Sequence, residues 1–221
     1  GLLAVLPDTE RTEGRFDFFG FLALSFAIGG LQLMLDRGQT KDWFSSPEII
    51  TYACVMGLTF YLFLVHTLTF NRPFLSPSLF VDKNFITCSI FIFLVGVILY
   101  ATLALLPPML QNQLNYPVFT TGLVTAPRGI GTFSAMIVVG RLIGYIDARL
   151  IIITGLAMIA FALWQMTGFN LQMDSNLVIV SGLIQGFGIG LAFVPLSTIA
   201  FTTLAPQLRN EGTAFFSLMR N

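Results

Sequence analysis

The chain has 221 residues, of which 55% are hydrophobic and only 10% are charged, and its mean hydropathy is +0.82. Soluble domains carry about 25% charged residues, so this composition excludes an ordinary soluble domain and indicates an integral membrane protein. The formal net charge is zero, which gives no reason to expect nucleic acid as a partner. Cys54 and Cys88 stand in apolar stretches without metal-ligand spacing, and they are interpreted as packing residues. Neither a metal site nor a cofactor is predicted.

The two ends of the chain indicate an internal fragment of a longer protein. Residue 1 is glycine rather than methionine, and the last residues, GTAFFSLMRN, start a new apolar helix. Residues 1–17 are expected to be a cytoplasmic linker after an upstream span, because the charged, turn-rich run PDTERTEGR follows a short apolar stretch. Residues 205–221 are expected to be a cytoplasmic loop and the start of the next helix.

The first two complete spans are expected at residues 18–35 and 49–70. Asp17 directly precedes the first span, where its carboxylate can cap the helix. The second span contains the only histidine, His66, which is interpreted as an interfacial or packing residue, with a proton relay as the alternative. One face of the first span is interpreted either as a helix-packing surface or as part of a transport path: Ser25, Gly29, Gln32 and Asp36.

A third span is expected at residues 86–106, which carry no charge and are long enough to cross a hydrocarbon layer of about 30 Å. Pro107 and Pro108 are expected to end it, because proline lacks the backbone N–H of a helix interior. The preceding connection, residues 71–85, begins with basic and proline residues and continues with an amphipathic pattern. It is predicted to lie along the cytoplasmic membrane surface.

The stretch 118–150 contains an apolar span that is interrupted by Pro127 and Arg128. Pro127 is expected to bend the helix, because it removes one backbone donor. A charged side chain inside a membrane is costly, which makes Arg128 a candidate functional residue. Residues one helical turn apart form a small, polar stripe that is expected to face protein or water: Thr121, Thr125, Arg128, Thr132 and Ala135.

Glycines distinguish the last complete span, residues 177–204. Gly182 and Gly186 form one GxxxG pair, and Gly186 and Gly190 form a second, so a neighbouring backbone can approach closely along this side. Together with Pro195, these glycines predict a helix that packs tightly and bends. A second small, polar face of this span comprises Ser181, Gln185, Gly188 and Ala192.

Six complete spans, the fifth of which covers residues 151–169, bring both ends of the chain to the same side of the membrane. The set of loops that would lie on the opposite side holds only Arg37 and Lys41. The positive-inside rule therefore predicts that both ends are cytoplasmic. The basic residues on the predicted cytoplasmic side are Arg11, Arg15, Arg72, Lys83, Arg141, Arg149, Arg209 and Arg220.

No motif of a membrane-embedded enzyme is recognised. The sequence has no HExxH pair, no second histidine, no phosphate-binding loop and no nucleophile elbow, so no catalytic residue is predicted. The interiors of the spans also lack Asp and Glu, although proton-driven transport usually requires an intramembrane carboxylate. Proton coupling is therefore expected to depend on residues elsewhere in the full protein, unless Arg128 or His66 takes part.

Three strings carry a family resemblance: LQLMLDRGQTKDWF at 31–44, LPPMLQNQLNYPVFTTGLVTAPRGIGTFSAM at 106–136, and GFGIGLAFVPLSTIAF at 186–201. They resemble the EmrB/QacA-type multidrug efflux transporters, which are fourteen-span drug:proton antiporters of the major facilitator superfamily. The resemblance implies an all-α, polytopic helical membrane protein with a major-facilitator-type bundle. Residues 18–70 would then be two central inserted helices, and residues 86–204 the first four helices of the second six-helix half.

The loop GRLIGYIDARL, residues 140–150, resembles a degenerate copy of the superfamily's GxLxDRxGRR motif. Gly144, Asp147 and Arg149 are the counterparts that this resemblance suggests. The spacing departs from the motif, so a helix cap and topology marker is the interpretation preferred over a charge relay. The family's proton-carrying acids belong to the first half and are expected outside this chain.

These observations predict part of a proton-coupled secondary active transporter that exports amphipathic drugs or toxic compounds across the bacterial inner membrane by alternating access. A narrow-substrate exporter of a siderophore or metabolite, and a non-transporting membrane scaffold, are the alternatives. The expected partners are the lipid bilayer, an amphipathic small molecule and protons, and a periplasmic adaptor and outer-membrane channel occur in the family. The transport-path candidates are Arg128, Gln32, Gln185, Thr125 and Thr132. The helix-packing and hinge candidates are Gly182, Gly186, Gly190, Pro127 and Pro195.

Overall fold

The computed structural model describes residues 16–70 and 73–221, and its regular structure is helical. Within these ranges the only β feature is an isolated bridge between Ile143 and Ile146. The chain divides into two compact units, Gly1–Pro77 and Ser78–Asn221. In the described ranges six helical segments are long and apolar enough to cross a membrane, which confirms the all-α, multi-span fold expected from the sequence. The linker expected at the start of the chain, with Arg11 and Arg15, lies outside the described residues, as does Arg72.

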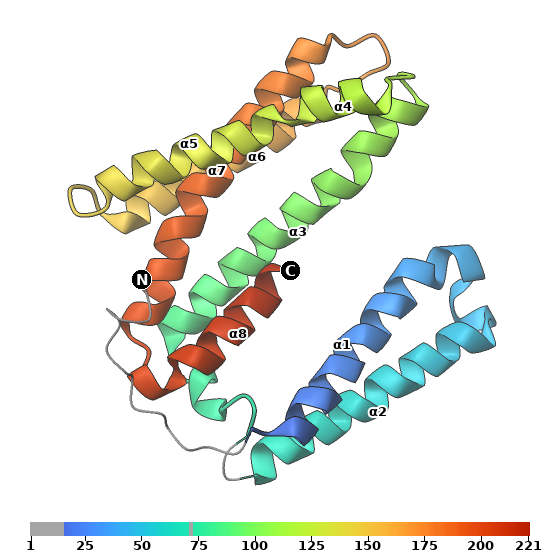
Figure 1. The fold of residues 1–221 in the computed structure, drawn as a ribbon, viewed down its shortest axis with the longest axis vertical. Helices are drawn as coiled ribbons and strands as arrows, with labels where there is room; N and C mark the ends of the chain where they lie inside the picture. Colours follow the sequence, from blue (N-terminus) through green and yellow to red (C-terminus); the bar gives the residue numbers. More distant parts are fainter. Residues whose placement is uncertain (1–15, 71–72) are drawn as a thin grey trace, which may run out of the picture. The chain divides into compact units, whose positions relative to one another are not determined.

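The first unit is a helical hairpin of α1, Phe18–Gly38, and α2, Pro47–Thr69 (Figure 1). Two short 3-10 turns, η2, Gln39–Lys41, and η3, Trp43–Ser45, join the helices. Small residues of α1 form its contact with α2, because a Cβ added at Gly30 would lie 3.2 Å from the backbone nitrogen of Met56. The buried residues of α1 are Gly20, Ala23, Ala27, Gly30 and Gly38.

The second unit is organised around one buried helix, α7, which packs against α3, α4, α5 and α6. Of its most apolar 18-residue window, 56% is buried, the largest share among the six spans. Figure 1 shows α5, α6 and α7 lying together, with α8 beside α3. From Pro77 onward the elements are η4 (Pro77–Phe80), α3 (Lys83–Asn112), α4 (Val118–Thr125), α5 (Pro127–Leu142), α6 (Ala148–Met166), α7 (Ser175–Thr202), η5 (Pro206–Leu208) and α8 (Arg209–Arg220).

The expected end of the third span at Pro107 and Pro108 is wrong. Helix α3 continues through both prolines to Asn112 (Figure 1). The prolines remove two backbone donors, a loss that membrane helices tolerate. Continuing the helix places Leu110, which is fully buried, in one apolar cluster with Leu106, Val124 and Val178. Packing of this last turn therefore outweighs the local cost of the prolines.

Close backbone contacts hold α5 against α7. A Cβ added at Gly186 would collide with the carbonyl oxygen of Arg128, and one added at Gly190 would lie 2.6 Å from the carbonyl oxygen of Thr132. The contact is reciprocal, since a Cβ at Gly131 on α5 would lie 2.9 Å from the backbone nitrogen of Phe187. Glycine is therefore required where the two backbones meet.

The opposite side of α7 meets α6 in the same way. A Cβ added at Gly188 would lie 2.7 Å from the carbonyl oxygen of Gly155, and one added at Gly155 would lie 2.7 Å from that of Gly188. Gly182 has a looser environment, with the Cβ of Arg128 at 3.9 Å. The close approach that the GxxxG spacing predicts is thus found at Gly186 and Gly190, whereas Gly182 lies at ordinary contact distance.

Candidate functional site

The junction between α4 and α5 positions Arg128. Pro127 occupies the first turn of α5, where a helix has no acceptor for the missing N–H. Ala126 keeps helical dihedral angles and donates its N–H to the carbonyl oxygen of Gly122 at 2.9 Å. The backbone therefore stays helical up to the junction. The span that hydropathy predicts is therefore divided into two helices at Pro127.

The polar stripe along α4 and α5 faces the protein, as expected. Thr121, Arg128 and Ala135 are buried, and Thr125 and Thr132 are half-buried. The hydroxyl of Thr132 lies 3.0 Å from the carbonyl oxygens of Arg128 and Gly186, so it can donate to either helix backbone. The stripe is thus part of the contact between α5 and α7.

Arg128 is 9% exposed, and its Nε atom is buried without a hydrogen-bond partner. No ion pair joins its guanidinium to any residue in the described ranges. The side chain lines a cavity of about 270 Å³ between α3, α4 and α5, together with Thr102, Pro107 and Thr125. Burying a cation without a counter-ion is expensive, so this position is costly unless a partner enters the cavity.

A buried hydrogen bond links α3 and α7 beside this cavity. The side-chain amide of Gln185 is fully buried and donates from Nε2 to Oγ1 of Thr102 at 3.0 Å. Thr102 in turn donates to the carbonyl oxygen of Ile98 at 2.7 Å. The Oε1 atom of Gln185 has no partner in the described part of the chain. Sequence analysis missed Thr102, because only its contact with Gln185 distinguishes it from the other threonines in the spans.

A larger, apolar cavity of about 410 Å³ lies between α3 and α6. Thr102 and Leu106 line both cavities, at the part of α3 where Thr102 bonds Gln185 and Leu106 belongs to one apolar cluster with Val178. Buried Arg128 and this apolar cavity therefore both belong to the group of membrane-spanning helices α3 to α6. The other lining residues of the larger cavity come from α3, α6 and the turn after α6: Val97, Ile98, Ala101, Leu105, Met109, Leu163, Met166 and Phe169.

Gln32 belongs to the first unit and is exposed on α1. The face that it shares with Ser25 and Asp36 is exposed, whereas Ala23 and Ala27 face α2. Within the hairpin this face is therefore not the contact with α2. Its packing against a helix outside the hairpin and its assignment to a transport path both stay predictions.

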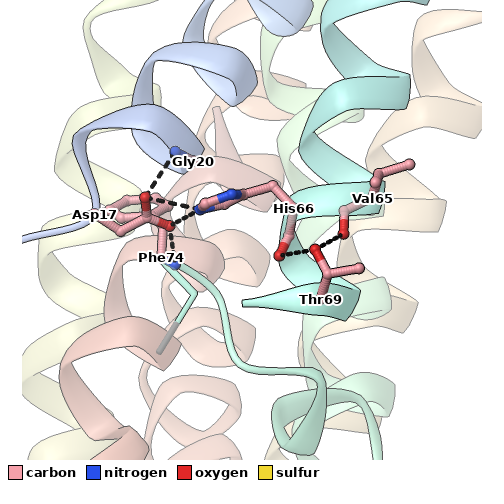
Figure 2. Close-up of polar contacts among 6 residues, drawn as sticks. All are labelled: Asp17, Gly20, Val65, His66, Thr69 and Phe74. Carbon is pink, nitrogen blue, oxygen red and sulfur yellow. Dashed lines mark hydrogen bonds and ion pairs between the residues drawn. The ribbon is translucent and has the colours of Figure 1, made fainter. Parts of the chain in front are cut away.

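Asp17 is the centre of a polar cluster at the open end of the hairpin (Figure 2). Its carboxylate accepts hydrogen bonds from the backbone N–H groups of Gly20 and Phe74, both at 2.9 Å. The Nε2 atom of His66 lies 2.9 Å from both carboxylate oxygens. The capping role expected for Asp17 is therefore found, and the packing role of His66 includes a polar contact with this carboxylate.

The environment of this cluster is largely apolar. The side chains of Asp17 and His66 are only 6% and 17% exposed, and the rings of Phe19 and Phe70 lie 4.9 Å and 4.7 Å from that of His66. Burial alone would raise the pKa of Asp17, but hydrogen bonds from Gly20, His66 and Phe74 outweigh it and lower the pKa below its ordinary value. The cluster joins α1, α2 and the segment after α2 at one point.

The loop before α6 shows the geometry of a helix cap. Gly144 has a φ of +110°, which only glycine adopts readily, and Asp147 accepts a hydrogen bond from the backbone N–H of Arg149 at 2.9 Å. The side chain of Arg149 makes no ion pair with a residue in the described ranges. The cap interpretation of this loop fits these contacts, and its role as a topology marker stays a prediction.

Comparison with known proteins identifies the family to which the chain belongs. Residues 2–221 match the model of the Major Facilitator Superfamily. The fatty acid resistance protein FarB of Neisseria gonorrhoeae is 37% identical over 195 residues, which cover 88% of this chain and 38% of that protein. The multidrug export protein EmrB of Escherichia coli K12 is 33% identical over 201 residues, 90% of this chain and 39% of EmrB.

The probable multidrug resistance protein EmrY of Escherichia coli K12 is 32% identical over 204 residues, with 89% of this chain and 39% of EmrY covered. The chain thus spans about two-fifths of the length of these relatives. Its six apolar helices agree with a multi-pass membrane protein. The match over residues 2–221 shows that the chain belongs to the Major Facilitator Superfamily.

Proposed function

We propose that the chain forms part of a proton-coupled secondary active transporter that exports amphipathic drugs or other toxic compounds across the bacterial inner membrane. Family membership supports a transporter rather than an enzyme. The names of its relatives, which refer to multidrug export and to fatty acid resistance, support an amphipathic substrate. Because the chain spans two-fifths of these relatives, the activity is that of the whole protein.

The observation that carries this proposal is buried Arg128, which makes no ion pair in the described ranges, has a buried Nε without a hydrogen-bond partner and lines the cavity between α3, α4 and α5. A charged residue inside a membrane helix usually marks a substrate or ion pathway. Thr125 lines the same cavity, and Gln185 holds Thr102 at its wall. Arg128, Thr125 and Gln185 are therefore proposed to belong to the transport path, with Thr132 and Gln32 as further candidates.

The packing of α5, α6 and α7 suits alternating access. Backbone contacts at Gly186, Gly190 and Gly188 make these helices a closely packed group. Major facilitator transporters move as bundles that rock around a fixed central site. We propose that this group moves as one body, and that Pro127 and Pro195 permit local bending within it.

Proton coupling is proposed to depend on an acid outside these spans. In the described ranges no Asp or Glu lies in a span interior, and Asp36 and Glu48 stand at helix ends beside a loop. The basic residues support cytoplasmic ends, with Gly144, Asp147 and Arg149 in a cytoplasmic loop. A periplasmic adaptor and an outer-membrane channel complete the proposed set of partners.

The test is efflux of a fluorescent cationic dye from cells that express the full-length protein, with and without a protonophore. Efflux that stops when the protonophore is added would support a proton-coupled multidrug exporter. Absence of dye efflux, with proton-dependent export of one siderophore or metabolite, would favour a narrow-substrate exporter. A protein that inserts well but exports no compound would contradict transport and favour a scaffold.

Arg128→Ala in the full-length protein is expected to abolish resistance and leave membrane insertion intact, because the position faces a cavity rather than filling a core. Lys83→Ala is the matched control, since Lys83 is exposed at the start of α3. Resistance and insertion are measured on the same cells. Unchanged efflux in Arg128→Ala would reduce Arg128 to a structural residue.

A further inference from the structure

We propose that a groove between α5, α6 and α7 binds one phospholipid of the bilayer. One acyl chain of the lipid occupies the groove, and the phosphate of its headgroup pairs with Arg141 at the mouth of the groove. No residue lines both this groove and the cavity of Arg128. The inference therefore concerns a second site, which does not depend on the transported compound.

The groove is a preformed apolar space of about 240 Å³. Its floor consists of Phe187 and Leu191 of α7, which belong to the packed cluster of α5, α6 and α7. Its outer side is open, because Leu150 is 58% exposed and Thr154 is also exposed. The hydroxyl of Thr154 donates to the carbonyl oxygen of Leu150 at 2.8 Å, so the polar group in the wall already has an acceptor.

The mouth of the groove lies where two spans end. Helix α5 ends at Leu142, which lines the groove together with Ile146 of the following loop. Thr154, the lining residue farthest along α6, is roughly 9 Å beyond the start of that helix, at about 1.5 Å per residue. Tyr145 in the loop is 91% exposed, as is typical of aromatic side chains at a membrane surface. The groove therefore extends from the headgroup region into the hydrocarbon.

An acyl chain fits this space better than a helix does. A helix is about 10 Å across with its side chains and rises about 5.4 Å per turn, so one turn occupies about 400 Å³. The groove offers less than that. Lipid acyl chains form the hydrocarbon layer at this depth, and a single chain is thin enough to lie in the groove.

Arg141 supplies a positive charge at the mouth. It follows Val138 by three positions on α5, so the two side chains are neighbours on one face of the helix, and Val138 lines the groove. Arg141 is exposed and makes no ion pair in the described part of the chain. Its planar guanidinium matches the oxygens of a phosphate, and basic pockets between membrane helices bind lipid headgroups in this way.

Two other charged residues stand near this loop, and neither replaces Arg141. Asp147 caps α6, where its carboxylate accepts a hydrogen bond from the backbone N–H of Arg149 at 2.9 Å. The side chain of Arg149 belongs to another face of α6, because its neighbours on the helix, Ile152 and Ile153, do not line the groove. Arg149 is therefore a matched control for Arg141.

The test measures how strongly brominated phosphatidylglycerol quenches the fluorescence of single tryptophans. Leu150→Trp lies in the groove, whereas Ile153→Trp is the control, because Ile153 is 62% exposed and lines no part of it. Each is placed in full-length protein whose own tryptophans are replaced by phenylalanine. The bilayer is an uncharged galactolipid with a small fraction of the brominated lipid. Quenching of Leu150→Trp is expected to exceed that of Ile153→Trp several-fold, because the groove concentrates the phospholipid.

Four variants of the Leu150→Trp protein examine the two parts of the site. Arg141→Gln should abolish the excess quenching, Arg141→Lys should keep part of it, and Arg149→Gln should leave it unchanged. Thr154→Phe fills the groove from an exposed position, so it should also abolish the excess. It remains a test if Arg141→Gln fails to insert. A brominated galactolipid, which lacks the phosphate, should quench Leu150→Trp and Ile153→Trp alike.

Three results would overturn the proposal. Equal quenching of Leu150→Trp and Ile153→Trp by brominated phosphatidylglycerol would place the lipid in the general layer around the protein. Absence of quenching at Leu150→Trp would show that protein covers the groove, either a second copy or another part of the full-length chain. Excess quenching that persists in well-inserted Arg141→Gln would exclude the pairing with the phosphate. Since no readout uses transport, these results leave the proposed function unaffected.

Discussion

The α1–α2 hairpin and the α5–α6–α7 group are built by different means, although both consist of apolar helices. In α2 only 11% of the most apolar window is buried, compared with 56% in α7. The hairpin combines one close glycine contact, at Gly30, with a cluster of polar contacts at Asp17, whereas α7 meets its neighbours through several glycines along its length. Between helices in lipid the hydrophobic driving force is weak, so small residues and interhelical hydrogen bonds determine the contact.

The candidate functional residues lie in the more deeply buried of these two regions. A helix that exposes most of its apolar surface, such as α2, contacts lipid or other parts of the full protein along that surface. Helix α7 instead buries polar Gln185 and Ser181 among close-packed neighbours. Buried polar groups that are only partly satisfied are costly, and they are found here next to the cavity that Arg128 lines. The candidate site therefore belongs to the tightly packed region.

The largest expected effect comes from adding one methyl group to α7. Gly186→Ala would force its Cβ into the backbone of Arg128, so α5 and α7 must separate. Such overpacking is expected to lower the free energy of unfolding by about 3 kcal/mol. Gly57→Ala in α2 is the control, because no atom lies within 4 Å of the added Cβ. Thermal unfolding of the purified protein measures both. Equal effects would contradict the difference between the two regions.

The hydrogen bond between α3 and α7 gives the next effect. Thr102→Val leaves the buried amide of Gln185 without any partner, which should lower stability by about 1 to 3 kcal/mol. Gln185→Leu removes that bond but also the unpartnered Oε1, so its effect should stay within about 1 kcal/mol. The comparison is made by thermal unfolding of both variants under the same conditions. A larger loss for Gln185→Leu would show that Oε1 has a partner in the full protein.

A smaller and more local effect is expected in the hairpin. Asp17→Ala removes the cap of α1 and the contacts with His66 and Phe74, which should cost about 1 to 2 kcal/mol. Faster hydrogen exchange at the start of α1, with α7 unchanged, is the expected observation. Asp36→Ala, at an exposed site near the other end of α1, is the control. Faster exchange throughout the protein would contradict a local role.

The same contact predicts a dependence on pH. Because the pKa of Asp17 is lowered in the folded protein, its contribution is complete above the ordinary aspartate value of about 3.9 and is lost as pH falls through the lower folded value. Protection of the first turn of α1 should therefore be constant from neutral pH down to this range. Loss of protection well above pH 4 would show that another group controls it.

Hydropathy and spacing predict the six spans, because charge-free runs and period-3.6 stripes directly encode helices that cross a membrane. They fail at Pro107 and Pro108, where the fit of Leu110 against Val124 and Val178 decides the helix length. That fit depends on residues distant in the sequence. The close helix contacts of Gly186 and Gly190 are predicted from a GxxxG motif on one helix. The contact of Gly155 on α6 cannot be predicted in this way, because its partner Gly188 lies on another helix.

The candidate site is predicted only in part for the same reason. Arg128 and Gln185 stand out because polar side chains are rare in apolar spans. Thr102 is one of several threonines, and only its contact with Gln185, 83 positions away, distinguishes it. Likewise, Asp17 and His66 are separately visible in the sequence, but their pairing across 49 positions requires the hairpin.

The most direct measurement is cysteine labelling at Thr125 in an otherwise cysteine-free full-length protein, with a small polar thiol reagent. Thr125 lines the cavity of Arg128, whereas Leu123, on the same helix, is exposed and lines none of the cavities described. Labelling of Thr125→Cys should slow several-fold when a transported substrate is added, and Leu123→Cys should show no such dependence. Labelling of Thr125→Cys that substrate leaves unchanged, while transport continues, would contradict a transport path through this cavity.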